Sequence, residues 1–146
     1  LLPHCRIVLG GPEVSHHPEQ EQTEFDCDTI ISGEGEEVIL PVLEKLQQGK
    51  SPPPVVTGAP CEVSKIPVVY NDRELQDVSG RIVYYEASRG CPFSCAYCLS
   101  GGERRVQYKP ADQIKAELTR LSSNGAKLIK LVDRTFNADR AVAREI

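Results

Sequence analysis

The chain has 146 residues, with 17 Lys and Arg against 21 Asp and Glu and a formal net charge of −4 at pH 7. This balance gives no indication of nucleic-acid binding through a basic face, and no apolar run is long enough to cross a membrane. A hydrophobic fraction of 40% suits an ordinary α/β protein, while the lack of Met and the abrupt beginning at Leu1 predict a piece of a longer protein.

Residues 1–50 alternate strand and helix signals. Residues 5–9 predict a short apolar strand, and residues 29–31 predict a second, buried one. Each strand runs into a glycine-containing loop, the first with Gly10 and Gly11, the second with Gly33, Glu34 and Gly35. The polar segment with His16 and His17 is interpreted as a solvated loop, because adjacent histidines rarely converge on one metal ion.

An amphipathic helix follows the second loop. Ile39, Val42, Leu43 and Leu46 fall at i, i+3, i+4 and i+7 on one helix face, and Gly49 ends the helix. The order strand, loop, strand, helix predicts the late part of an open parallel α/β sheet.

Residues 51–80 are expected to form a proline-rich linker that drapes over two domains. They contain the triplet Pro52-Pro53-Pro54 and show little periodicity. Proline triplets favour extended polyproline II structure and break both helix and sheet.

Residues 81–146 predict a right-handed βαβ unit. Residues 81–87 are rich in β-formers, and Tyr84 and Tyr85 are expected to pack in the sheet. Pro110 opens a helix, Gly125 ends it, and its apolar stripe consists of Ile114, Leu118 and Leu121. Residues 127–132 form the next strand, and residues 140–146 have helical character.

The loop after the first strand of this unit carries three cysteines in a C-x3-C-x2-C pattern: Cys91, Cys95 and Cys98. A [4Fe–4S] cluster normally takes four thiolates, so three ligands leave one iron open to another molecule. Zinc sites favour C-x2-C pairs and four ligands, and disulfides are not expected without a secretory signal. Gly90 permits close backbone approach, and Arg89 either offsets the charge of a cluster or forms an ordinary ion pair.

The second strand of the unit ends directly before Asp133-Arg134-Thr135-Phe136-Asn137. In (β/α) barrels the functional face is the one at the carboxyl ends of the strands. This segment is therefore expected to share a face with the cysteine loop.

The cysteine motif, with Tyr97 before its last cysteine, resembles that of the radical S-adenosylmethionine (SAM) enzymes. In that family the open iron chelates SAM, and an electron from the cluster cleaves it to methionine and a hydrogen-abstracting 5′-deoxyadenosyl radical. The resemblance implies that Tyr97 lies against the adenine and that Asp133 binds the methionyl amino group. Core packing of Tyr97 and a helix N-cap or ion-pair role for Asp133 are the alternatives. Gly101-Gly102-Glu103 spells the family's amino-binding motif in the wrong place and is expected to form a turn.

Residues 1–50 resemble the later half of the flavodoxin-like cobalamin-binding domain that precedes many radical SAM barrels. The resemblance implies that both glycine loops contact the nucleotide tail of cobalamin, through Gly10, Gly11, Gly33, Glu34 and Gly35. The earlier half of that domain, with any histidine that would ligate cobalt, is absent. The expected fold class is α/β: the C-terminal part of a flavodoxin-like, Rossmann-like domain (1–50), a linker (51–80), and the first βαβ of a partial (β/α)6 barrel (81–146).

The sequence thus predicts a segment of a radical SAM enzyme with a [4Fe–4S] cluster, SAM and cobalamin as cofactors, and it does not identify the substrate. Methyl transfer to an unactivated carbon is expected if cobalamin is catalytic, and hydrogen abstraction with rearrangement if it is not. An exposed cluster further implies a reducing cytoplasm and an electron donor such as a flavodoxin or ferredoxin.

Two other classes stay open. One is a methylthiotransferase acting on RNA or a ribosomal protein, a group that holds a second cluster on three N-terminal cysteines. Cys5, Cys27 and Cys61 are instead expected to be buried thiols, because free cysteine beside apolar strands commonly behaves as a small hydrophobe. The other class is an iron–sulfur binding or electron-transfer module that never binds SAM.

Overall fold

The computed structural model describes residues 5–67, 70–98 and 105–146. It divides the chain into two compact units, Leu1–Cys61 and Glu62–Ile146, which are called unit 1 and unit 2 below. The turn expected at Gly101-Gly102-Glu103 lies outside the described residues.

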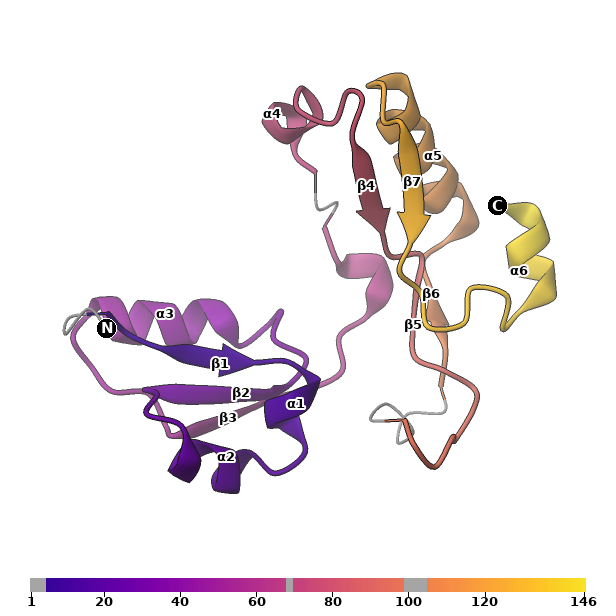
Figure 1. Ribbon diagram of the computed structural model, residues 1–146. Coiled ribbons are helices and arrows are strands. Elements are labelled where there is room, and N and C mark those ends of the chain that lie inside the picture. The colour runs from indigo at the N-terminus through magenta and orange to yellow at the C-terminus, as the bar shows by residue number, and fades with distance from the viewer. Residues whose placement is uncertain (1–4, 68–69, 99–104) are drawn as a thin grey trace. The chain divides into compact units, whose positions relative to one another are not determined.

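Unit 1 is built on a three-stranded parallel sheet (Figure 1). Its strands are β1 (Val8–Gly10), β2 (Thr29–Gly33) and β3 (Val55–Gly58), in the order β1-β2-β3. The helices are α1 (Pro12–Ser15), α2 (Pro18–Glu24) and α3 (Ile39–Gln47). The expected α/β class with a parallel sheet is therefore confirmed for the described part of this unit.

The central strand β2 is buried along its first three residues. β2 pairs with β1 on one side and with β3 on the other. Thr29 and Ile30 are fully buried, and Ile31 is 5% exposed. Consecutive residues that are all buried, without the alternation of a half-exposed strand, are typical of a central strand in a parallel sheet.

Two parts of unit 1 differ from the sequence expectation. The segment expected to be linker contributes the third strand, β3, because the extended proline triplet leads directly into the sheet. The prolines lack an N–H but keep their carbonyls, and Pro53 O accepts from Thr29 Oγ1 at 2.6 Å while Pro54 O accepts from Ile30 N at 2.8 Å. The polar segment expected to be a loop forms two short helices, each opened by a proline in its first turn. His16 and His17 themselves lie exposed in the bend between these helices, as expected for solvated loop residues.

Unit 2 contains a parallel strand pair and an antiparallel one. Its elements are η1 (Val63–Lys65), α4 (Asp72–Leu75), β4 (Ile82–Tyr85), β5 (Ser88–Arg89), β6 (Gln107–Tyr108), α5 (Ala111–Ser123), β7 (Leu128–Leu131) and α6 (Arg140–Glu145). β4 pairs with β7 in parallel, from Ile82 opposite Leu128 to Tyr85 opposite Leu131. With α5 between them in the sequence, β4 and β7 form the expected βαβ unit.

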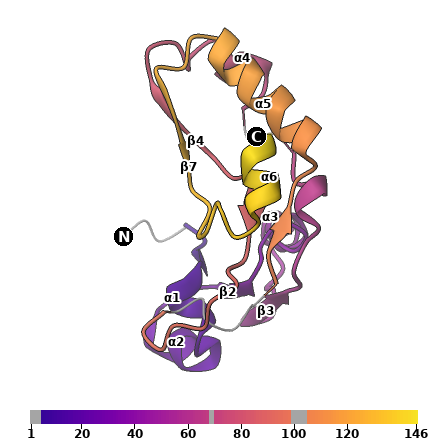
Figure 2. The same cartoon turned by 90° about the vertical axis from the view of Figure 1, so that its right-hand side faces the viewer.

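The core of unit 2 lies between the β4–β7 pair and α5, which runs beside these strands in Figures 1 and 2. Ile114 and Leu121 of α5 are 0% and 1% exposed. β4 alternates strictly: Val83 and Tyr85 are buried, whereas Ile82 and Tyr84 are 49% and 56% exposed. The expected sheet packing therefore holds for Tyr85 but not for Tyr84.

The glycine at the end of β3 is required by close backbone packing. A Cβ atom added to Gly58 would lie 1.6 Å from the carbonyl oxygen of Glu34. We expect Gly58→Ala to lower the free energy of unfolding of unit 1 by about 3 kcal/mol, because the backbone must shift to admit the methyl group. Hydrogen exchange of β2 and β3 amides in increasing urea measures this loss.

Gly35→Ala is the matched control for Gly58→Ala. The nearest atom to its added methyl group is Ile31 Cγ2 at 3.8 Å, an ordinary contact. The control should change the free energy of unfolding by less than about 1 kcal/mol. Equal effects of the two substitutions would contradict the packing of Gly58 against Glu34.

Candidate functional site

A short antiparallel ladder forms the neck of the cysteine loop. β5 pairs with β6, placing Ser88 opposite Tyr108 and Arg89 opposite Gln107. Gly90 follows with φ 98°, and a Cβ on it would lie 2.1 Å from Arg105 O. Only glycine fits where the two sides of the neck approach so closely, which confirms the role expected for Gly90.

The three motif cysteines lie on the described stretch that leaves this neck. Cys91 is half-buried, Cys95 and Cys98 are exposed, and all three are free thiols. A backbone hydrogen bond from Cys98 N to Cys95 O, 3.0 Å long, forms a turn between the last two. Tyr97 is 91% exposed, so core packing of its ring is wrong, and its expected contact with adenine stays a prediction.

Thr135 reaches Cys91 from the turn after β7. The hydroxyl oxygen of Thr135 lies 3.3 Å from the Cys91 sulfur. The Thr135 hydroxyl, the backbone N–H of Phe93 and the nearby Arg134 charge lower the pKa of the Cys91 thiol, against a smaller opposing effect of burial. The sequence by itself predicts no role for Thr135, although the position of this residue just after a strand end is a usable signal.

Asp133 lies at the base of the same loop. Its two carboxylate oxygens accept from the backbone N–H of Ala87, at 3.2 Å, and from the Ser88 hydroxyl. The structure therefore brings the end of β7 to the start of the cysteine loop, as expected from the parallel topology. Because each carboxylate oxygen can accept more than one hydrogen bond, contact with an ammonium group stays a prediction for Asp133.

Arg89 forms an ion pair. Its guanidinium lies 2.7 Å from Glu86 Oε2, with both side chains partly buried. Of the two roles considered for Arg89, the structure displays the ion pair within the neck.

A buried charged network holds the neck from the side of α5. Lys109 Nζ donates to Glu117 Oε2 at 2.9 Å, and the Tyr85 hydroxyl donates to the same oxygen at 2.5 Å. Gln113 donates to the other carboxylate oxygen at 2.8 Å. The Lys109 and Glu117 side chains are only 5% and 7% exposed. The backbone N–H of Lys109 also donates to Ala87 O at 3.0 Å, which ties the network to the neck.

The protonation states of this network follow from its contacts. Burial by itself raises the pKa of the Glu117 carboxyl, but the hydrogen bonds from Tyr85, Gln113 and Lys109 outweigh it and hold that pKa below its ordinary value. Burial, and then the Glu117 carboxylate, raise the pKa of Tyr85 far above its ordinary range, so its hydroxyl stays a donor. The sequence signal that was overlooked is a glutamate on the same helix face as Ile114 and Leu121.

The two glycine loops of unit 1 lie at the carboxyl ends of β1 and β2, where open sheets bind ligands. Ser15 ties them together, since its hydroxyl donates to Gly11 O at 2.7 Å and accepts from Gly33 N at 3.1 Å. A Cβ on Gly33 would lie 2.5 Å from Gly58 O, so packing within the chain already requires this glycine. The Glu34 carboxylate accepts from Cys61 N at 2.7 Å. A Cβ atom added to Gly10 or Gly35 would meet no described atom closer than 3.6 Å, and one added to Gly11 would meet none within 4 Å.

The N-terminal cysteines do not form one group. Cys61 is buried and Cys27 half-buried, but Cys5 is exposed, so the prediction of a buried thiol is wrong for Cys5. It precedes the edge strand β1, where less of the chain covers it. Cys27 lies before β2 and Cys61 after β3. Because these neighbouring strands are parallel, the two thiols lie at opposite ends of the sheet.

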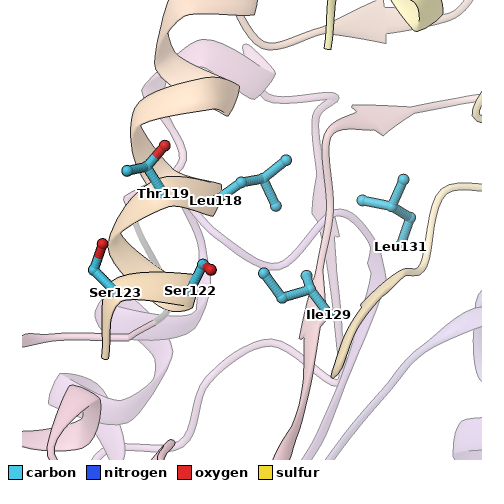
Figure 3. A pocket seen from close by; sticks show the side chains of 6 residues that line it. All are labelled: Leu118, Thr119, Ser122, Ser123, Ile129 and Leu131. Carbon is cyan, nitrogen blue, oxygen red and sulfur yellow. The ribbon is translucent and has the colours of Figure 1, made fainter. Parts of the chain in front are cut away.

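A groove of about 460 Å³ lies between α5 and β7 (Figure 3). It is lined by Leu118, Thr119, Ser122, Ser123, Ile129 and Leu131. None of these six residues is a cysteine or has an ionisable side chain, and the leucine and isoleucine side chains face the space between helix and strand. The groove therefore offers apolar surface and none of the groups that the cysteine loop provides.

None of the helices in the described ranges has the length and apolar character needed to span a membrane.

Comparison with known proteins relates the chain to methyltransferases and methylthiotransferases. No family model matches it. It is 28% identical to an uncharacterized methyltransferase of Pyrococcus horikoshii, over 96% of this chain and 36% of that protein. It is 26% identical to the bacteriochlorophyllide d C-8(2)-methyltransferase of Chlorobaculum tepidum, over 73% of this chain and 24% of the relative.

A methylthiotransferase is also among the relatives. The chain is 26% identical to the ribosomal protein uS12 methylthiotransferase RimO of Prochlorococcus marinus, over 88% of this chain and 29% of that protein. The chain thus spans between 24% and 36% of the length of these three relatives.

The buried carboxylate Glu117 gives unit 2 a pH dependence. Its folded-state pKa lies below the unfolded value of about 4.5, so its stabilising effect is complete above that value and is lost as the pH falls toward the folded pKa. We expect Glu117→Gln to remove this acid sensitivity and to cost about 3 kcal/mol at neutral pH, because Lys109 is left buried without its partner. Urea unfolding of unit 2 from about pH 3 to about pH 7, a range that includes the titration of a glutamate carboxyl, measures both effects.

Glu145→Gln is the control for Glu117→Gln, because it removes an exposed ion pair with Lys115. It should change the free energy of unfolding by less than about 1 kcal/mol. Parallel pH profiles for the wild type and Glu117→Gln would contradict the network.

Proposed function

We propose that the chain is a segment of a radical SAM enzyme in which Cys91, Cys95 and Cys98 hold a [4Fe–4S] cluster. The observation that carries the proposal is the position of the cysteine loop, which leaves the carboxyl edge of a parallel strand pair through a fixed neck. That edge also carries the Asp133–Thr135 segment, so the chemistry-bearing residues of both strand ends meet there.

The donor set fits a cluster with one open iron. Three free thiols lie on one loop, two of them exposed. The Cys91 sulfur has hydrogen-bond donors beside it that favour its thiolate form, which is the form that binds iron. When bound, the cluster supplies the electron for reductive cleavage of SAM.

The residues of the chain would then bind and orient SAM. The exposed ring of Tyr97 offers a stacking surface for the adenine, and the Asp133 carboxylate offers an acceptor for the methionyl ammonium. The bonds from Ala87 and Ser88 fix that carboxylate in place, so it needs little reorganisation to receive a cation.

The names of the relatives support group transfer as the outcome of the reaction. Two of the three are methyltransferases. We propose a cobalamin-linked methyl transfer on a substrate that the chain does not identify. Cobalamin would contact the glycine loops of unit 1 through Gly10, Gly11 and Gly35. Gly33 and Glu34 are already engaged within the chain, so the glycine loops fit cobalamin less closely than the cysteine loop fits the cluster.

A methylthiotransferase is the second candidate, because RimO is a relative. A second cluster on the N-terminal cysteines is not supported, since Cys27 and Cys61 lie at opposite ends of the sheet and cannot ligate one cluster. The proposal also includes a small electron donor such as a flavodoxin or ferredoxin, and a reducing cytoplasm as the compartment, because an exposed cluster needs both.

The cluster ligands are tested by substitution in the intact, anaerobically reconstituted protein. We expect about four irons per chain in the wild type, and loss of most of this iron in Cys91→Ala, Cys95→Ala and Cys98→Ala. Reduction in the presence of SAM should release 5′-deoxyadenosine from the wild type only. Iron analysis and chromatography of the nucleoside products measure these outcomes.

Cys27→Ala is the matched control and should leave the iron content unchanged. About eight irons in the wild type would favour the methylthiotransferase, and a stable cluster without 5′-deoxyadenosine release would favour the electron-transfer module. Retention of full iron content by all three motif variants would contradict the ligand assignment.

The role of Tyr97 is tested by SAM affinity. We expect Tyr97→Ala to raise the Kd for SAM about tenfold, since stacking on an aromatic ring contributes about 1–3 kcal/mol per base. Phe93→Ala is the control, because Phe93 is also exposed on this loop. Equilibrium dialysis with the cluster-loaded protein measures both constants, and equal Kd values for the wild type and Tyr97→Ala would contradict the stacking role.

A further inference from the structure

We propose that Thr135 is a positioning residue that tunes the iron–sulfur cluster: its hydroxyl donates a hydrogen bond to the Cys91 sulfur and raises the reduction potential. This inference rests on the proposed function, in which Cys91 is a cluster ligand. Thr135 contributes no ligand atom and acts only through Cys91.

The contact joins two parts of the chain that the fold holds in register. Thr135 and Cys91 are 44 residues apart in sequence, and their Oγ1 and Sγ atoms are 3.3 Å apart. Two constraints fix Thr135 from its own side. Its carbonyl accepts from Ala138 N at 3.1 Å in the turn after β7, and Asp133, two residues earlier, is bonded to Ala87 and Ser88.

The direction of the hydrogen bond follows from the chemistry of the cluster. In the free protein either the thiol or the hydroxyl can be the donor. A thiolate bound to iron carries no hydrogen, so the Thr135 hydroxyl must then donate and the sulfur must accept.

A donor at a ligand sulfur favours the reduced cluster. Reduction adds negative charge to the cluster and its thiolates, and a hydrogen bond to sulfur stabilises that charge. The Arg89 guanidinium, another group near the loop, is paired with Glu86 at 2.7 Å, so its charge is offset. Thr135 therefore acts on the Cys91 sulfur together with the N–H of Phe93, and only the hydroxyl can be removed by a side-chain substitution.

The test compares Thr135→Val, which keeps the β-branched shape without the hydroxyl, with Thr135→Ser, which keeps the hydroxyl. Redox potentiometry of the intact, reconstituted protein, followed by EPR of the reduced cluster, measures the midpoint potential. We expect a shift to more negative potential in Thr135→Val and a return toward the wild-type value in Thr135→Ser. Thr119→Val in α5 is the matched control and should not shift the potential.

Thr135→Ala is measured alongside, as a second hydroxyl-free variant, in case valine disturbs the turn. One outcome is a wild type that holds its cluster while Thr135→Val and Thr135→Ala have the same midpoint potential as the wild type. That result would overturn this inference and leave the proposed function intact. A wild type that binds no cluster would overturn both.

Discussion

The parallel pairing of β4 with β7 is the constraint on which the rest of unit 2 depends. Its register sets Tyr85 opposite Leu131, so the residues that follow each strand emerge side by side. The hydrogen bond from Val132 N to Tyr85 O, 2.9 Å long, extends the pairing past the last strand residues. Asp133 and Thr135 consequently reach Ser88 and Cys91 across 45 and 44 residues of sequence.

The cysteine loop is exposed, yet its base is held on both sides. On one side Asp133 bonds to the first residues after β4, and on the other the buried pair of Lys109 and Glu117 anchors the chain that returns from the loop. A buried ion pair adds little net stability compared with apolar packing, but it fixes the geometry of the groups that it joins. Binding and catalytic residues commonly lie on loops that a rigid scaffold holds in place.

The sequence predicts α5 and β7 well, because their periodicities are local. α5 and β7 begin and end within two residues of the expected bounds, and the glycine at 125 has the positive φ that ends a helix. β3 was missed because a proline triplet is a sound local signal for a break, whereas the neighbouring strand β2 supplies pairing that only the fold reveals. The contact of Thr135 with Cys91 was missed for the same reason, since its partner is set by strand register. The buried Lys109 could not be predicted from the sequence, because lysine is buried only when it is paired and its partner Glu117 is brought to it by the fold.

The central claim is that the three cysteines of this loop leave one iron of a cluster open to SAM. The most direct measurement is the EPR spectrum of the reduced, intact protein, recorded anaerobically while SAM is added. The account predicts that SAM changes the g-values of the cluster signal. The change should saturate at about one equivalent of SAM per cluster, because one iron of the cluster is open. A reduced cluster whose spectrum stays the same at all SAM concentrations would contradict it.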